Sequence, residues 1–337
     1  MAVYWRRDAN YLEPIRSART PFVVWAAELG ALFAHAGGPS TENDADAIGQ
    51  IVRWGVLDLN AFGPIADEYY RNPDRQGPHD LATSTSALRE GGVRMGFAGP
   101  SPVEPWLFRD APLEPSAGSP AQGIEIDFSV RRAQWQIMQF RWDIPSRTYL
   151  RYQYGGPHLD ARTGQPLRFT TVIAMRASFA VVDDEGHVVI DQIGSGKATI
   201  FTDGLAIDAT WKKPGRNART RFFDATGVEI RFARGPIFIE VIGPASSLLV
   251  SARGEDLPDL PPYVPSPAFL ATPEPEETAT TVATPVPTVA TATPSTTPRG
   301  TASPSPSGAA TVAGQPSVKP ASPSATVTPP ASPEPTR

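Results

Sequence analysis

The pattern of apolar and polar positions divides the chain near its middle, because the period of the pattern changes there. In the first hundred residues, segments with a helical period alternate with short apolar runs typical of buried strands. The pattern predicts strands at 2–5, 31–36 and 56–59 and helices at 22–29, 45–54 and 85–90. Helices that alternate with strands at this spacing indicate a parallel or mixed sheet covered by helices.

Capping signals support the predicted helix boundaries. Thr20-Pro21 predicts the start of the first helix, and Gly30 predicts its end. The second helix is expected to take Ser40 or Thr41 as its N-cap. Gly91-Gly92 is expected to close the third helix.

The second half of the chain alternates with a period of two, which is typical of half-buried strands. Strands are predicted at 124–128, 148–154, 171–182, 187–190, 197–201, 205–211, 220–223, 228–232 and 237–241. Turn signals such as Asp203-Gly204 separate them at intervals of about ten residues. This half therefore predicts an antiparallel meander, sandwich or barrel.

These patterns predict an α+β chain with two domains and a tail. We expect an incomplete N-terminal α/β domain at 1–98, a linker rich in Pro, Gly and Ser at 99–121, and a mainly antiparallel all-β domain at 122–244. Residues 245–337 are dominated by Pro, Thr, Ser and Ala. Such a composition cannot bury enough apolar surface to offset chain entropy, so this tail is expected to be disordered.

Composition limits the compartment and the partners. The formal net charge of −5 gives no electrostatic reason to expect nucleic acid or an anionic membrane surface as partner. The absence of cysteine excludes disulfides, thiolate metal sites and a cysteine nucleophile. No transmembrane run and no signal peptide are visible, whereas a Thr/Ser/Pro tail is typical of surface proteins. No cofactor is implied.

Two groups of polar residues are expected to meet at one edge of the N-terminal sheet. Arg16 and Arg19 stand just before the first helix, and His35 with Gly37 and Gly38 follows the next strand. Ligands of open α/β sheets bind beyond the carboxyl ends of strands, and a pair of guanidinium groups can grip a carboxylate, sulfate or phosphate. The arginines could equally form structural ion pairs, and His35 could be a general base, a metal ligand or a hydrogen-bonded core residue.

His79-Asp80 is a second candidate for the same edge, because it lies in a loop before the third helix. With His35 it could supply a base and an orienting carboxylate, or part of a zinc site. The histidines lack the spacing of a metal motif, so no metal is assigned. Thr83 or Ser84 as a nucleophile lacks the G-x-S-x-G context.

Ser195 and Lys197 are secondary candidates, since they lie in the stretch Gly194-Ser195-Gly196-Lys197. A P-loop is rejected, because Asp191 and Ala198 occupy two required positions and a strand follows instead of a helix. The stretch is expected to form a turn or bulge, with Lys197 facing solvent or an acidic partner.

Aromatic side chains are dense in the first part of the β domain. They are Trp135, Phe140, Trp142, Tyr149, Tyr152 and Tyr154. They could form a platform for stacking sugars, but core packing explains the same density and is the favoured interpretation.

The ordered motifs EPIRSAR at 13–19, HAGG at 35–38, PHDL at 78–81, IGSGKA at 193–198 and WKK at 211–213 carry a family resemblance. The chain resembles the YerB-like family of bacterial lipoproteins, the N- and C-terminal domains of unknown function 3048, over residues 1 to about 243. Members of that family usually begin with a signal peptide and a lipobox cysteine. The resemblance therefore implies an extracytoplasmic, envelope-associated protein, a start upstream of Met1, and membrane contact only through a lipid anchor that this chain lacks.

The leading functional hypothesis is a cell-envelope protein whose interdomain cleft binds an anionic peptidoglycan or glycan component. Arg16, Arg19, His35 and His79 are expected to make the contacts. The alternative is a hydrolase of envelope polymers in which His35 or His79 acts as acid or base. A structural surface spacer is a third class, and it predicts no cleft.

Overall fold

The computed structural model describes residues 1–4, 8–97, 99, 101, 103–129, 136–262 and 264. Met1–Thr272 form one compact unit. Trp135 and the predicted tail from position 265 onward lie outside the described residues. The α+β fold class is confirmed, since three α-helices precede a long series of mostly antiparallel strands.

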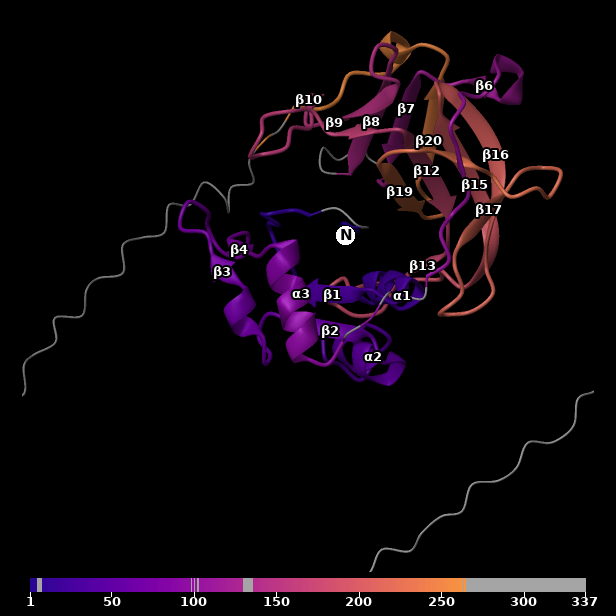
Figure 1. Ribbon diagram of the computed structural model, residues 1–337. Coiled ribbons are helices and arrows are strands. Elements are labelled where there is room, and N and C mark those ends of the chain that lie inside the picture. The colour runs from indigo at the N-terminus through magenta and orange to yellow at the C-terminus, as the bar shows by residue number, and fades with distance from the viewer. Residues whose placement is uncertain are drawn as a thin grey trace, which may run out of the picture. The chain divides into compact units, whose positions relative to one another are not determined.

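The N-terminal region is built on two parallel strands, β1 and β2, which pair from Leu32 with Leu57 to His35 with Asn60. Helices gather around them (Figure 1). The elements are α1 (Thr20–Leu29), β1 (Leu32–His35), α2 (Ala47–Trp54), β2 (Leu57–Asn60), the 3-10 helix η1 (Ala66–Glu68), β3 (Tyr70–Arg71), β4 (Leu81–Ala82) and α3 (Thr85–Arg94). The predicted parallel pairing is confirmed. The predicted strand at 2–5 is corrected for Ala2 to Tyr4, which pair with no described strand, whereas its last position lies outside the described residues.

The helix boundaries differ from the predicted ones at three caps. Helix α1 begins one residue early, at Thr20, and its N-cap Arg19 makes no side-chain capping bond. Helix α2 is capped by Asp46, whose carboxylate accepts from the backbone N–H of Gly49 at 2.9 Å. Helix α3 continues through Gly91-Gly92 to Arg94.

The two glycines inside α3 are needed for close packing. A Cβ atom on Gly92 would lie 3.0 Å from both methyl carbons of Leu32, and one on Gly91 would lie 3.3 Å from the Ile65 Cδ1 atom. Because these glycines have no side chains, α3 can lie directly on β1 and η1. The close packing outweighs the poor helix propensity of glycine. The Gly91-Gly92 pair consequently does not act as the predicted helix terminator.

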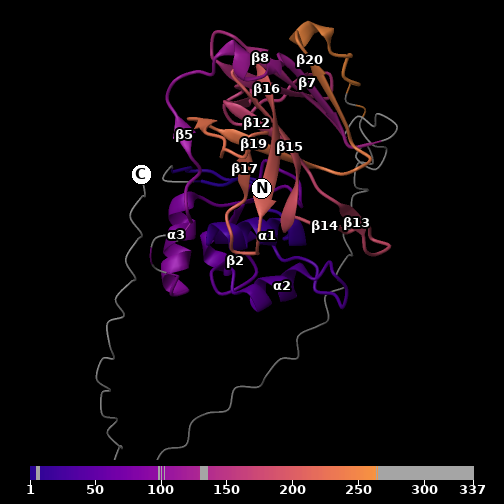
Figure 2. The same cartoon turned by 90° about the vertical axis from the view of Figure 1, so that its right-hand side faces the viewer.

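The β-rich region consists mainly of two sheets (Figures 1 and 2). One has the order β17-β16-β15-β12-β19 with β6 on β16, and the other has the order β10-β9-β8-β7-β20 with β11 on β9. All pairings in these sheets are antiparallel except that of β12 with β19. The first sheet comprises β6 (Ser119–Pro120), β12 (Thr171–Arg176), β15 (Gly194–Thr202), β16 (Leu205–Lys213), β17 (Arg221–Phe223) and β19 (Ile237–Ile242), and the second β7 (Gly123–Asp127), β8 (Ile137–Asp143), β9 (Thr148–Gln153), β10 (Gly156–Pro157), β11 (Arg168–Phe169) and β20 (Ser247–Ser251).

Short elements complete the region. Helix α1 contacts the β-rich region at β14, and Figure 2 shows these two elements close together. The short elements are β5 (Phe108–Arg109), β13 (Phe179–Val181), β14 (Val188–Ile190), β18 (Phe232–Ala233) and the 3-10 helices η2 (Pro115–Ala117) and η3 (Gly254–Asp256).

The strand predictions are corrected at several places. The predicted strand at 171–182 is two strands, β12 and β13, and residues 228–231 form no strand beyond a single bridge at Glu229. Strand β8 was not predicted, and Gly194 to Lys197 belong to β15 instead of a turn or bulge. Regular structure also continues past position 244, since β20 pairs with β7 and Leu257 is buried.

The aromatic cluster of the β-rich region forms its core. Phe140 and Tyr149 are fully buried, and the ring of Trp142 lies 4.9 Å from that of Tyr149. Tyr152 instead lies under the guanidinium group of Arg141 at 4.7 Å. For Phe140, Trp142 and Tyr149, core packing is therefore the better interpretation.

A buried charged network joins α1 to the β16 and β17 strands. The Glu28 carboxylate, whose side chain is 0% exposed, accepts from Lys213 Nζ at 2.9 Å and from Arg219 Nη1 at 2.6 Å. It also accepts from the hydroxyl and the backbone N–H of Thr220 at 2.6 and 2.9 Å. Lys213 Nζ donates further to the carbonyl oxygens of Arg216 and Ala218. Both carboxylate oxygens of Glu28 and the ammonium group of Lys213 are hydrogen-bonded, whereas Arg219 Nε has no hydrogen-bond partner among the described residues. The network links residues that lie far apart in the sequence.

Asp203 organises the tight turn between β15 and β16. Asp203 and Gly204 have φ angles of 55° and 74°, the left-handed values that a two-residue hairpin turn requires. Burial alone would raise the pKa of Asp203, but the N–H of Leu113 and the guanidinium groups of Arg109 and Arg147 hold the pKa below its usual range. The ionised carboxylate therefore connects the turn to the segment at 109–113 and to Arg147.

Replacing Asp203 with asparagine is expected to lower the melting temperature at pH 7. It should also make the decrease in melting temperature between pH 7 and pH 3 smaller than in the parent protein. A carboxyl group whose pKa is lower in the folded state adds stability above its unfolded pKa of about 3.9, and that stability is lost as the pH falls through the folded pKa. Thermal unfolding between pH 7 and pH 3 measures the difference. A variant that loses as much stability in acid as the parent protein would contradict this role.

Candidate functional site

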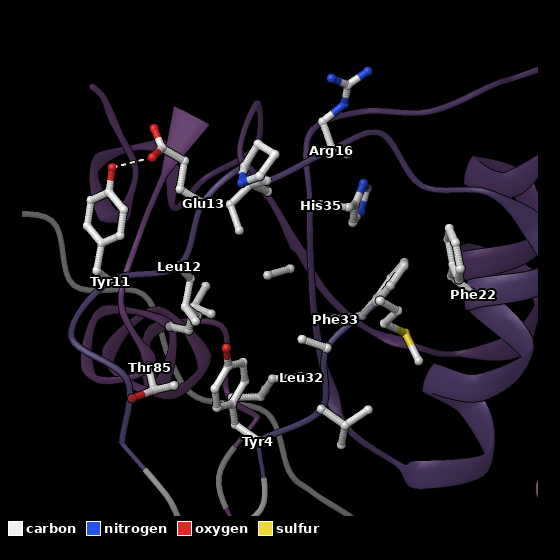
Figure 3. A pocket seen from close by; sticks show the side chains of 18 of the residues that line it. Tyr4, Tyr11, Leu12, Glu13, Arg16, Phe22, Leu32, Phe33, His35 and Thr85 are labelled. Atoms are coloured by element: carbon white, nitrogen blue, oxygen red, sulfur yellow. Dashed lines mark hydrogen bonds between the residues drawn. The ribbon is translucent and has the colours of Figure 1, made fainter. Parts of the chain in front are cut away.

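A cavity of about 1610 Å³ opens beside β1 and carries several of the predicted site residues. Its walls come from the segment before α1, from α1 and β1, from the loop around β3, from Met1 to Tyr4, and from the loop at 160–163. In Figure 3, Arg16 and His35 lie at one end and Tyr11 and Glu13 at the other. Apolar side chains, among them Leu12, Leu32 and Phe33, project into the same space (Figure 3).

Arg16 and His79 meet at the rim of this cavity. Arg16 Nη1 lies 2.8 Å from His79 Nδ1, and both side chains are exposed. Since a guanidinium group only donates, the Nδ1 atom of His79 is the acceptor in this contact. Arg16 Nη1 also donates weakly to the carbonyl oxygen of Pro78 at 3.5 Å. The side chains of Arg16 and His79 thus lie together at the rim, although the two residues are 63 positions apart in the sequence.

His35 lines the cavity but is 1% exposed. Its Nδ1 atom lies 2.8 Å from the carbonyl oxygen of Gly37, and its Nε2 atom lies 2.8 Å from Asp58 Oδ1. Both partners are acceptors, so both ring nitrogens are engaged within the fold. In this geometry His35 holds the turn after β1 in place, and neither nitrogen is directed at a ligand in the cavity.

Gly37 and Gly38 allow the turn after β1 to pack against the segment that carries Arg16. Gly37 has a φ angle of 62°, and its N–H donates to Asn60 Oδ1 at 3.0 Å. A Cβ atom on Gly38 would lie 3.1 Å from the Cβ atom of Ala18. Backbone hydrogen bonds from Ala36 to Arg16 and from Ala18 to Gly37 complete the contact. The EPIRSAR and HAGG motifs are therefore adjacent, and the glycines shape the backbone that positions Arg16.

Arg19 and Asp80 are placed differently from Arg16 and His79. Arg19 Nη1 donates to the carbonyl oxygen of Ala18 at 2.8 Å, and Arg19 does not line the cavity. Asp80 accepts from Arg71 at 2.6 Å, so it does not orient His79. The structure brings Arg16, His35 and His79 to one cavity and leaves Arg19 and Asp80 in local contacts. Their binding roles remain predictions.

The far end of the cavity contains polar residues that the sequence did not single out. Glu13 accepts from the hydroxyl of Tyr11 (Figure 3). It also accepts from Asn72 Nδ2, and Arg75 Nε lies 3.7 Å from Glu13 Oε2. The guanidinium carbon of Arg162 lies 5.1 Å from the centre of the Tyr11 ring. Glu13 belongs to the EPIRSAR motif and could have been found there, whereas nothing near Arg162 signalled this contact.

The charges around the cavity favour an anion. The charged residues that line it are Arg16, Arg75, Arg89 and Arg162 and the acids Glu13, Asp74 and Asp160. Arg75 lies near Glu13, Arg89 pairs with Asp8, and the backbone N–H and hydroxyl of Thr163 bind the Asp160 carboxylate and keep its pKa below the usual range. Arg16 has no carboxylate partner among the described residues, so it is the cationic group at the rim that an anion could contact.

The other candidates lie outside the cavity or have local partners. Ser195 and Lys197 are exposed on β15, paired with Lys212 and Thr210. Ser84 caps α3 by accepting from the N–H of Ala87, and the Thr83 hydroxyl donates to the carbonyl oxygen of Glu68. No group of three or more His, Asp or Glu side chains within the described ranges is arranged to hold a metal ion. In the same ranges, no helix is long and apolar enough to cross a membrane.

Two family models and one curated relative match this chain. Residues 1–98 match the family model described as "Protein of unknown function (DUF3048) N-terminal domain", and residues 124–239 match that of the C-terminal domain. A Bacillus subtilis (strain 168) protein named "Putative lipoprotein YerB" is 22% identical over 215 residues, which are 63% of this chain and 62% of that protein. The matched part thus spans less than two thirds of this relative.

A solved structure shares the fold. The crystal structure of the YerB protein from Bacillus subtilis matches with a TM-score of 0.59 and 22% sequence identity. The match covers 71% of this chain and 78% of that chain. At this identity the likeness concerns the fold alone.

Proposed function

The chain belongs to the DUF3048 family of proteins of unknown function, and from this premise we propose that it is a cell-envelope protein that binds an anionic peptidoglycan or glycan fragment. The name of the Bacillus relative, a lipoprotein, supports the envelope location. The observation that carries the binding proposal is the contact of Arg16 with His79 at the rim of a large cavity.

A carboxylate or phosphate entering the rim would replace the contact between Arg16 and His79. Arg16 Nη1 would then donate to the anion, and the imidazole of His79 would donate from its protonated nitrogen. His35, Gly37 and Gly38 would serve indirectly, because they fix the backbone beside Arg16. The more distant Arg75 and Arg162 add positive charge along the same cavity.

Binding is preferred over hydrolysis because, within the described part of the chain, His79 has no carboxylate partner of the kind that orients a general base. Its neighbour is the guanidinium group of Arg16, whereas a catalytic histidine is usually oriented by a carboxylate. Asp80, the nearest carboxylate in sequence, is paired with Arg71. His35 has both nitrogens engaged within the fold.

Arg16→Ala and His79→Ala are each expected to weaken binding of an oligogalacturonate, a carboxylated glycan, by about 10- to 100-fold. A charge-assisted hydrogen bond contributes about 1.5–3 kcal/mol, and 1.4 kcal/mol corresponds to tenfold. Isothermal titration calorimetry measures the affinity, with maltotriose as the uncharged control ligand.

Arg19→Ala is the matched control, because it removes a neighbouring guanidinium group that does not line the cavity. It should bind like the parent protein. Equal affinities of the parent, Arg16→Ala and His79→Ala proteins would refute the proposal, and release of shortened oligosaccharides would favour the hydrolase instead.

A further inference from the structure

Strand β1 leaves one of its edges open along the cavity. Within the described ranges β1 pairs only with β2, and four consecutive residues, Leu32 to His35, line the cavity. Side chains of a strand point alternately to opposite faces, so a row of consecutive lining residues places the cavity at the edge of β1. Figure 3 shows Leu32, Phe33 and His35 in order along one side of the cavity, with Arg16 beyond His35.

Hydrogen bonds on both sides of β1 show which backbone groups point to the open edge. The carbonyl oxygen of His35 accepts at 2.8 Å from the N–H of Ala61, which directly follows β2. The N–H of Ala36 donates at 3.0 Å to the carbonyl oxygen of Arg16, on the opposite side. Successive residues of a strand direct their backbone groups to opposite edges. Every second residue counted back from Ala36 therefore directs its N–H and C=O away from β2 and toward the cavity.

Leu32 and Ala34 are the residues whose backbone groups face this edge. Neither residue has a printed partner outside the pairing of β1 with β2 among the described residues, and both are half-buried where they line the cavity. Unpaired edge groups are a template for another extended chain at about 4.8 Å. An aliphatic ligand would leave them unpaired, whereas a peptide offers an N–H and a C=O to each residue.

The charge at the end of the edge sets the direction of such a peptide. Arg16 lies at the carboxyl end of β1, is exposed and has no carboxylate partner among the described residues. A peptide parallel to β1 would bring its C-terminal carboxylate to Arg16. An antiparallel peptide would bring its N-terminus there. Because a guanidinium group attracts a carboxylate, charge complementarity favours the parallel direction.

We propose that the open edge of β1 binds the peptide part of a peptidoglycan fragment as a short parallel strand, with its free C-terminal carboxylate at Arg16. This inference rests on the proposed function, since it uses the same anion contact. The backbone of Arg16 already occupies the edge at Ala36, so only Leu32 and Ala34 are open and a peptide of a few residues fits. Ladder pairing uses backbone atoms alone, so the D-alanine residues that usually end such peptides can take part.

The peptide N-acetyl-alanyl-alanyl-D-alanyl-D-alanine tests the inference on the full chain by isothermal titration calorimetry. We expect this tetrapeptide to bind, and its C-terminal amide, which lacks the charge, to bind about 10- to 100-fold more weakly. The all-L tetrapeptide represents the other source of such an end, the C-terminus of a protein. Equal binding of the acid and the amide, or binding of the all-L peptide alone, would overturn the inference.

Methylated tetrapeptides separate strand pairing from a contact of the carboxylate alone. Alternate amide nitrogens of an extended peptide face the same edge, so one alternate pair would face β1 and the other pair would face away. Methylation of the pair that faces β1 should weaken binding by about tenfold or more, and methylation of the other pair should change it little. Equal effects of the two methylated peptides would contradict pairing with β1.

Ala34→Pro tests the same pairing from the side of the protein. Proline is tolerated in an edge strand where its missing N–H makes no ladder bond, so the variant should fold, as its melting temperature would show. It should bind the tetrapeptide about tenfold or more weakly, because the edge loses a donor. A folded Ala34→Pro protein with the affinity of the parent would refute the inference.

The oligogalacturonate separates failure of this inference from failure of the proposed function. If the oligogalacturonate binds and the tetrapeptide does not, the inference fails and the proposed function stands. If the tetrapeptide binds the parent but not Arg16→Ala, and the oligogalacturonate does not bind, the inference stands and the glycan form of the proposed function fails. If neither ligand binds, both fail.

Discussion

Replacing Lys213 with methionine is expected to destabilise the protein by about 3–5 kcal/mol, the usual consequence of removing one partner of a buried ion pair. Lys213 and Glu28 have side chains that are 1% and 0% exposed, and their charged atoms lie 2.9 Å apart. Methionine cannot donate to the Glu28 carboxylate, which would remain buried with less compensation. The carbonyl oxygens of Arg216 and Ala218 would lose the same donor.

Urea unfolding followed by circular dichroism measures this free energy. Lys212→Met is the matched control, because Lys212 is the exposed neighbour and its ammonium group lies over the Phe223 ring. A double variant with Glu28→Met should recover part of the loss, since it removes the carboxylate that the single variant leaves behind. A loss below about 1 kcal/mol for Lys213→Met, the range of an exposed ion pair, would show that the pair is not buried in solution.

The network of Glu28 also explains a motif that sequence reasoning could not interpret. In the WKK motif at 211–213, Lys213 reaches α1, while Trp211 is buried in the β-rich region. The sequence places Glu28 and Lys213 185 residues apart, with no periodicity to connect them. These charged side chains come into contact only because α1 packs against the region of β16 and β17.

The period of the hydrophobic pattern predicted most elements, but it does not show which polar residues are buried. Residues 138–143 of β8 alternate between apolar and polar types, so the signal for this strand was present in the sequence and was overlooked. The alternation alone does not reveal that Gln139, at a polar position, is fully buried and donates to Glu125 and to the carbonyl oxygen of Pro258. The cap of α2 could not be predicted, because Ser40, Thr41 and Asp46 all have capping side chains and only the tertiary structure selects Asp46.

The sequence predicted which backbone segments lie together at the candidate site. A rule about strand ends was enough to place Arg16 beside the turn after β1, where hydrogen bonds from Ala36 and Ala18 confirm the proximity of the two motifs. The partners of each side chain were not predictable. Whether His35 is available to a ligand depends on Asp58, a residue of the neighbouring strand that no motif contains.

Replacing Gly196 with alanine is expected to destabilise the protein by about 1–3 kcal/mol, the usual range for inserting an atom into a packed site. Gly196 pairs with Trp211 across β15 and β16. A Cβ atom at this position would lie 2.5 Å from Trp211 Nε1 and 3.0 Å from the carbonyl oxygen of Arg176. Trp211 Nε1 donates to that oxygen at 2.8 Å, so the indole cannot move away without losing its hydrogen bond.

The Gly194-Ser195-Gly196-Lys197 stretch therefore has a structural role, which single substitutions within it can test. Ser195→Ala and Lys197→Ala alter exposed side chains, so each should change the free energy of unfolding by less than about 0.5 kcal/mol. Chemical denaturation of the three variants measures the contrast. A stable Gly196→Ala protein, together with Ser195→Ala or Lys197→Ala proteins that lose ligand affinity, would instead assign the stretch to a binding surface. The close approach of Trp211 to the Gly196 backbone is the reason to expect the opposite result.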